Sequence, residues 1–214
     1  MTFEEIVNDT FIAEAVKHNS LLLLDIDDTL VKAQGINIYK IYPDGKEEVL
    51  TPQEFAEENV PEEEKKGIKY SYRDFRDPDK VARSIKTGLP IVSNLKTMDN
   101  YIQNGWKIGI LTARGLEDVM GDVMKEWLKF KNEKGELEKV GPKLIKDLVF
   151  AINDDTKHYP GEGAFEKKAN IIKKLAKQYD RIVFIDDDKK NINTVKDMLQ
   201  KNNIKNVVPR LAKS

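Results

Sequence analysis

Apolar runs that end abruptly in polar residues recur along the chain. The first is Leu21 to Leu24, and acidic residues follow it at once. A continuous apolar run of this kind is typical of a strand that is buried on both faces, as in the centre of a parallel sheet. Further runs of this type occupy residues 107–112, 148–152, 181–186 and 205–209.

Helical patterns separate these runs. Apolar positions recur at helical spacing in residues 2–17, 95–102, 117–131, 164–179 and 192–200. Strands that alternate with helices indicate a doubly wound sheet of parallel strands. We therefore predict the α/β fold class, with a doubly wound, five-stranded parallel sheet.

The segment after the first strand breaks this alternation. Residues 36–50 have the pattern of a hairpin around the turn signal Pro43-Asp44-Gly45, and a short helix start follows. We interpret residues 32–89 as a small insertion that consists of a hairpin, loops and a short helix. It interrupts a core formed by residues 1–31 and 90–214.

Composition narrows the class of protein. The chain has 214 residues, with 36 Lys and Arg against 37 Asp and Glu, and a net charge of -1. This balance argues against a nucleic-acid binder driven by charge. The chain has no cysteine, which excludes disulfides, thiolate zinc sites and cysteine nucleophiles. The acidic N-terminus is not a signal peptide and no apolar run could span a bilayer, so we expect a soluble, cytoplasmic protein.

Two acids stand at the end of the first strand, where open α/β sheets bind ligands. Asp25 and Asp27 are two residues apart, so their side chains point the same way while the chain stays extended. Carboxylates held that close repel each other, which predicts a cation or a shared proton beside them. The alternative is that both acids are turn residues that merely end the strand. Asp28 is interpreted as a loop or capping residue.

Polar residues also end two later strands. Thr112 and Arg114 follow one apolar run, and Asp186 and Asp187 follow another. Parallel strands bring these ends to the same edge of the sheet. The alternative for the acidic pair is a helix N-cap, and we assign that role to Asp188.

Two lysines lie in the helix that precedes the second acidic pair. Lys168 shares a helical face with Ile172 and Leu175, which directs it toward the sheet. Lys167 lies about 100° further round the helix. We therefore favour Lys168 as the lysine that faces the strand ends.

This ordered set resembles the motifs of the haloacid dehalogenase (HAD) superfamily. The first HAD motif is an apolar run followed by Asp-x-Asp-x-Thr or Asp-x-Asp-x-Val, as in residues 21–29. The second is an apolar strand that ends in Ser or Thr, the third is a lysine, and the fourth is an apolar strand that ends in paired acids. Thr112, Lys168 and Asp186-Asp187 match them in order. The resemblance covers about residues 21–208 and implies a Rossmann-like core with a cap at residues 32–89.

Phosphoryl transfer requires these residue types. Asp25 is expected to attack phosphorus and form an aspartyl-phosphate, and Asp27 to act as general acid and base. Thr112 and Lys168 are expected to bind phosphoryl oxygens. Arg114 is expected either to bind a phosphate or sugar of the substrate or to form a surface ion pair.

The resemblance also implies a bound Mg²⁺ ion. The family pattern gives side-chain ligation by Asp25 and Asp186 and backbone ligation by Asp27. Asp187 is expected to ligate directly or to orient the waters of the metal. Hard oxygen ligands of this kind suit Mg²⁺.

These expectations define a Mg²⁺-dependent phosphomonoesterase. Its expected substrate is a small phosphorylated molecule, such as a nucleotide, a sugar phosphate or a nucleic-acid end. One alternative is another HAD phosphotransferase, such as a phosphomutase. A second is a non-catalytic binding or structural protein that keeps the fold. Glycoside hydrolysis by paired carboxylates leaves Lys168 and Asp186 unexplained.

Overall fold

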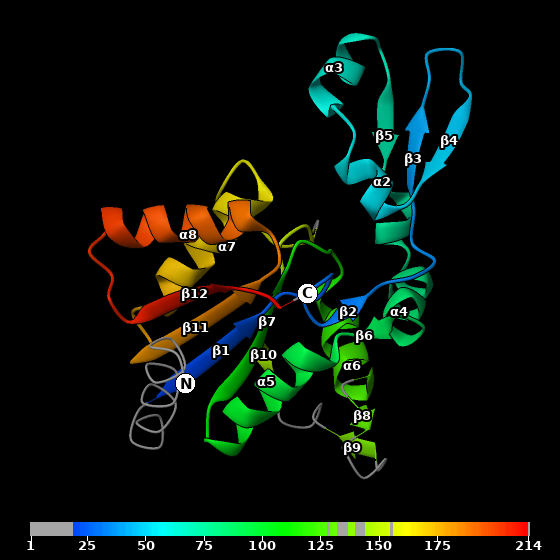
Figure 1. The fold of residues 1–214 in the computed structure, drawn as a ribbon. Helices are drawn as coiled ribbons and strands as arrows, with labels where there is room; N and C mark the ends of the chain where they lie inside the picture. Colours follow the sequence, from blue (N-terminus) through cyan, green and yellow to red (C-terminus); the bar gives the residue numbers. More distant parts are fainter. Residues whose placement is uncertain (1–18, 128, 132–136, 140–143, 155, 214) are drawn as a thin grey trace.

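The computed structural model describes residues 19–127, 129–131, 137–139, 144–154 and 156–213. In these ranges the core sheet has five parallel strands in the order β10-β7-β1-β11-β12 (Figure 1). The strands are β1 (Ser20–Leu24), β7 (Lys107–Thr112), β10 (Leu144–Ala151), β11 (Arg181–Asp186) and β12 (Val207–Leu211). The predicted α/β class with a doubly wound parallel sheet is confirmed.

Helices cover both faces of this sheet. Helices α5 (Val92–Gln103) and α6 (Glu117–Trp127) pack on one face, and α7 (Ala164–Leu175) and α8 (Lys189–Lys201) pack on the other (Figure 1). Alternate leucines of β1 enter the two apolar cores, because side chains of a strand point to opposite faces in turn. Leu22 and Leu24 lie in the first core, and Leu21 and Leu23 lie in the second.

No helix in the described ranges is both long enough and apolar enough to span a membrane.

Several element ends differ from the sequence predictions. Strands β7 and β11 match them, but β10 begins four residues earlier than expected, at Leu144. The helix predicted over 117–131 is wrong in its last turn, because β8 (Lys129–Lys131) pairs with β9 (Leu137–Lys139) in an antiparallel hairpin. Helix α7 ends at Leu175, where a turn closes the helix before Tyr179. The helix predicted over 2–17 lies outside the described residues.

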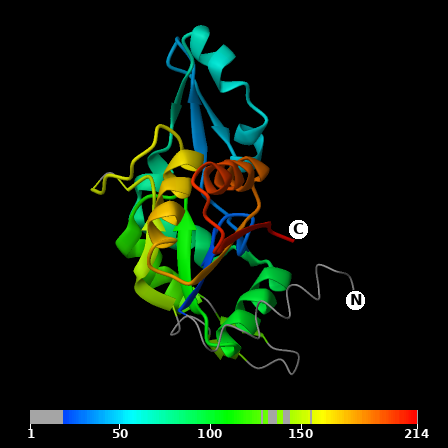
Figure 2. The same cartoon turned by 90° about the vertical axis from the view of Figure 1, so that its left-hand side faces the viewer.

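The insertion contains more regular structure than its sequence pattern indicated. Figures 1 and 2 show it projecting from the carboxyl edge of the core sheet. Its described strands form an antiparallel sheet in the order β4-β3-β5. The strands are β3 (Ile38–Ile41), β4 (Glu47–Leu50) and β5 (Lys69–Ser71), and the helices are α2 (Pro52–Ala56), α3 (Val60–Lys65), the 3₁₀ helix η2 (Arg73–Arg76) and α4 (Pro78–Lys86). The predicted hairpin is present as β3 and β4.

A short pair of strands closes the insertion at its base. Strands β2 (Val31–Lys32) and β6 (Leu89–Pro90) pair antiparallel where the chain leaves and re-enters the core. Gly88 precedes β6, and a Cβ atom there would lie 2.4 Å from Val31 Cγ2 and 2.8 Å from the Lys32 carbonyl oxygen. A glycine is therefore required for the two connections to run side by side.

Candidate functional site

Three neighbouring strands bring polar side chains to one edge of the core sheet. Strands β7, β1 and β11 lie side by side and parallel, so Thr112, Asp25 and Asp186 meet at their carboxyl ends. The Asp25 amide still donates to the Ile185 carbonyl, at 3.0 Å, which keeps Asp25 in line with β11. All three side chains are buried. The carboxylates of Asp25 and Asp186 therefore need a compensating charge.

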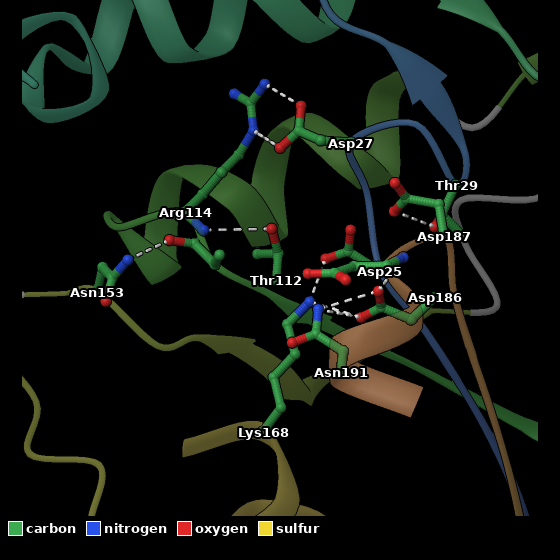
Figure 3. A network of polar contacts seen from close by, with 12 residues as sticks. Asp25, Asp27, Thr29, Thr112, Arg114, Asn153, Lys168, Asp186, Asp187 and Asn191 are labelled. Carbon is green, nitrogen blue, oxygen red and sulfur yellow. Dashed lines mark hydrogen bonds and ion pairs between the residues drawn. The ribbon is translucent and has the colours of Figure 1, made fainter. Parts of the chain in front are cut away.

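Lys168 supplies part of that charge. Its ammonium lies 3.0 Å from Asp25 Oδ1 and 2.7 Å from Asp186 Oδ2, so one cation bridges both acids (Figure 3). The Lys168 side chain is only 1% exposed. Helix α7 turns Lys168 toward the sheet together with Ile172 and Leu175, which are also buried. The neighbouring Lys167 points elsewhere, to the Ile152 carbonyl oxygen and to Asn153.

The electrostatic balance at Asp25 is incomplete. Burial raises the pKa of Asp25, and the nearby Lys168 ammonium offsets only part of that rise, while the Asp186 carboxylate adds to it. Burial lowers the pKa of Lys168, but the charges of Asp25 and Asp186 outweigh it and leave that pKa above its ordinary value. Full ionisation of Asp25 therefore calls for a further positive charge beside it.

Asp187 completes an acidic group at this edge. Single carboxylate oxygens of Asp25, Asp186 and Asp187 lie within 4.8 Å of one another. Burial raises the pKa of Asp187 to about 6, and the Asp186 carboxylate adds to the effect. Thr29 Oγ1 donates to Asp187 Oδ1 at 3.2 Å and fixes that side chain. Three carboxylates that lie this close together are a donor set suited to a hard divalent cation.

Asn191 is a site residue that the sequence interpretation missed. Its Nδ2 donates to both carboxylate oxygens of Asp186, at 3.0 Å each. The Asp188 backbone N–H also donates to Asp186 Oδ1, at 2.9 Å. Asp188 is the N-cap of α8, as predicted, so Asn191 lies in the first turn and reaches back to the strand end. Its position five residues after Asp186 was the available signal.

Asp27 and Arg114 form a separate pair on the rim of the site. Arg114 Nε and Nη2 each lie 2.7 Å from one Asp27 oxygen, which makes the ion pair bidentate. Nη1 of the same guanidinium donates to Ser84 Oγ at 2.9 Å, which connects this pair to helix α4 of the insertion. Arg114 is buried, whereas the Asp27 side chain is 39% exposed. The ion pair expected as one role of Arg114 is present, with a buried arginine and a partly exposed aspartate, whereas substrate binding by Arg114 stays a prediction.

Tight local structure separates Asp25 from Asp27. The Leu30 and Val31 amides both donate to the Ile26 carbonyl, and the chain reverses through Asp28, which has a φ of 52°. Figure 3 shows the result: Asp25 joins Lys168 and Asp186, while Asp27 points away from them to Arg114. Asp28 is a turn residue, as expected.

Thr112 lies beside Asp25 in the same view (Figure 3). Its Oγ1 accepts from the Arg114 backbone N–H at 3.3 Å, which leaves the hydroxyl hydrogen available to a ligand. The adjoining loop is fixed by Asn153, whose Nδ2 donates to the Ala113 carbonyl at 2.6 Å. The structure thus collects Asp25, Thr112, Lys168, Asp186 and Asp187 at one point, with Asp27 and Arg114 at its rim.

Comparisons with known proteins give one partial match. Residues 168–211 match a family model described as a protein of unknown function (DUF2608). The matched segment runs from Lys168 in α7 to the end of β12 and includes Asp186, Asp187 and Asn191. No curated protein and no solved structure matches the chain.

Proposed function

We propose that this chain is a phosphomonoesterase of the HAD type that uses Mg²⁺ and forms an aspartyl-phosphate on Asp25. One observation carries the proposal: Lys168 bridges Asp25 and Asp186, with Asp187 beside them, at the carboxyl edge of a parallel sheet. A strand or helix cap needs no buried lysine held between two acids. Phosphoryl transfer does need such an arrangement, because a carboxylate must approach phosphorus while positive charge neutralises the phosphoryl oxygens.

The donor set fits Mg²⁺. Asp25, Asp186 and Asp187 offer only oxygen ligands, and the raised pKa of Asp25 reflects a carboxylate that Lys168 alone does not neutralise. These three side chains would hold the ion, with the Asp27 backbone as the further ligand that the family resemblance implies. A bound Mg²⁺ would neutralise charge on the phosphoryl group and on Asp25.

Four residues of the site then have defined tasks in the reaction. An oxygen of Asp25 forms a bond to phosphorus as the ester oxygen departs. Asp27 protonates that departing oxygen and later takes a proton from the water that releases phosphate. Thr112 donates its hydroxyl hydrogen to a phosphoryl oxygen, and Lys168 neutralises another.

Arg114 has a positioning task in this proposal. Its bidentate ion pair fixes the Asp27 carboxylate at the rim, where 39% exposure leaves it open to an incoming alcohol or water. A bidentate pair restricts orientation more tightly than a single contact.

A cytoplasmic location for the enzyme stays a prediction.

Hydrolysis of p-nitrophenyl phosphate tests the proposal. Wild-type protein should release phosphate with Mg²⁺ and stop when EDTA is added. Asp25→Asn should be inactive, because an amide cannot form the acyl phosphate. The matched control Asp197→Asn changes an exposed acid of α8 and should retain activity. Equal rates for wild type and Asp25→Asn would refute the proposal.

A further inference from the structure

A cavity of about 560 Å³ lies between the insertion and the core, next to the proposed phosphoryl site. Tyr72 and Phe75 line it from the insertion, and Ala113, Asn153 and Lys167 line it from the core. The cavity therefore joins two parts of the chain that are far apart in sequence. It takes no part in the phosphoryl chemistry described above.

Hydrogen bonds fix the core wall of this cavity to the proposed site. Ala113 lies between Thr112 and Arg114, and its carbonyl accepts from Asn153 Nδ2 at 2.6 Å. The backbone N–H of Asn153 donates to the Arg114 carbonyl at 3.2 Å. A phosphate held by Thr112 and Asp25 would thus have its ester oxygen close to Arg114 and Asp27. The rest of the alcohol can then extend into the cavity.

One wall of the cavity carries an ammonium group held only by neutral oxygens. Lys167 Nζ lies 3.2 Å from the Ile152 carbonyl oxygen and 3.4 Å from Asn153 Oδ1. Among the residues that the structure describes, it has no carboxylate within salt-bridge distance. Lys157, a second lysine of this wall, instead forms an ion pair with Glu117. The charge of Lys167 is therefore available to an anion in the cavity.

The insertion contributes two aromatic residues to the lining, Tyr72 and Phe75, together with Ile38 and Arg76. The residue Tyr72 is 44% exposed, although its ring packs edge-on against Phe55 with 5.6 Å between the ring centroids. Phe75 lies one turn further on and reaches the apolar core from the same side. An exposed aromatic ring that faces a cavity favours a flat, apolar ligand group.

We propose that this cavity binds the leaving group of the substrate and selects one that has a planar ring and a second anionic group. The ring would lie against Tyr72 and Phe75, and the second anion would pair with Lys167. Nucleotides with two separate phosphate groups have both features. This inference rests on the proposed phosphomonoesterase function, since it assigns the scissile phosphate to Asp25.

Binding of two inert phosphonates tests the selection. The ligands are 4-carboxybenzylphosphonate and its carboxamide, which have nearly the same shape but differ by one charge. Titration calorimetry with Mg²⁺ present should show that wild-type protein binds the carboxylate about tenfold more tightly, the size of one charge-assisted contact. Lys167→Met should remove this preference, and Lys167→Arg should keep most of it. Lys174→Met, an exposed lysine of α7, is the control and should keep the preference in full.

The outcomes separate the two proposals. Equal binding of the two phosphonates by wild-type protein, or an unchanged preference in Lys167→Met, would overturn the cavity assignment alone. Binding of neither phosphonate, together with no hydrolysis of p-nitrophenyl phosphate, would overturn the phosphomonoesterase proposal and the cavity assignment with it. The aromatic wall is tested separately, because Tyr72→Ala should weaken both phosphonates by a similar factor.

Discussion

Asp27 and Arg114 are joined by two parallel hydrogen bonds of 2.7 Å, and the guanidinium that makes them is almost completely buried. The pair sits where the insertion meets the core, since Ser84 of α4 accepts a third hydrogen bond from the same guanidinium. The orientation of Asp27, the proposed general acid and base, therefore depends on Arg114, two residues after the end of β7, and on helix α4 of the insertion.

Replacing Arg114 should impair catalysis more than substrate binding. Arg114→Lys keeps the charge but cannot form the bidentate contact, so Asp27 loses its fixed orientation. We expect kcat for p-nitrophenyl phosphate to fall about tenfold to a hundredfold, with a much smaller change in KM. Steady-state kinetics check this, with Arg83→Lys on the exposed face of α4 as control. A rise in KM at constant kcat would instead indicate that Arg114 binds substrate.

Lys168→Met should destabilise the fold as well as abolish activity. The substitution leaves Asp25 and Asp186 buried at the strand ends without their shared cation. Removing one partner of a buried ion pair typically costs about 3–5 kcal/mol. Urea unfolding should show this loss, and added Mg²⁺ should restore part of it. Lys174→Met should unfold like wild type, and a similar stability for Lys168→Met would contradict the bridging role.

Asn191 is expected to set the affinity for the metal. Its two hydrogen bonds hold both oxygens of Asp186, and loss of such a partner of a metal ligand typically costs about tenfold to a hundredfold in metal affinity. Asn191→Ala should therefore require correspondingly more Mg²⁺ for half-maximal activity. Asn193→Ala, on the exposed face of the same helix, is the matched control. An unchanged Mg²⁺ titration in Asn191→Ala would remove Asn191 from the site.

Stability should depend on pH through Asp74 in the insertion. Burial by itself raises the pKa of this carboxyl, but hydrogen bonds from Lys80, Tyr39 and the Asn37 amide outweigh burial and leave the pKa below its ordinary value. A lowered folded-state pKa gives stabilisation that is present above the unfolded value, about 3.9, and is lost as pH falls through the folded value.

Asp74→Asn tests this pH dependence. At pH 7 it should lower the free energy of unfolding by about 1–3 kcal/mol, the cost of weakened hydrogen bonds to a buried group. The difference from wild type should narrow once the pH falls below about 4. Urea unfolding at a series of pH values measures it, with the exposed Asp79→Asn as control. A difference that stays constant down to the acid transition would contradict the assignment.

Much of the core could be predicted because its strands are apolar on both faces. The sequence predicts β7 and β11 to the residue, because each apolar run stands between two polar residues, Lys107 and Thr112 in β7 and Arg181 and Asp186 in β11. The predicted helix over residues 117–131 is longer than α6, because the apolar pattern continues into β8. Only the pairing of Lys129 with Lys139 shows that the helix has ended. Periodicity does not report pairing between distant segments.

The site was predictable to the extent that it lies at strand ends. Asp25, Thr112 and Asp186 follow apolar runs, and helical spacing already favoured Lys168 over Lys167. Ser84 could not be found in this way, because a buried serine is indistinguishable from an exposed one in sequence, and Asn191 is indicated only by its spacing of five residues from Asp186.

The prediction for the insertion is the least complete. Helix α4 has local signals that the prediction leaves out, namely Asp77 as N-cap, Pro78 in the first turn and the apolar pair Val81 and Ile85. Strand β5 is only three residues long and gains its order by pairing with β3.

Trapping the covalent intermediate tests the central claim most directly. Wild-type protein is mixed with p-nitrophenyl phosphate and Mg²⁺, quenched in acid during turnover, and treated with borohydride, which reduces an acyl phosphate to an alcohol. Peptide mass spectrometry should then find homoserine in place of Asp25, and Asp27→Asn should accumulate more of it because release by water is slowed. Turnover with Asp25 unmodified, or reduction at another residue, would contradict the account.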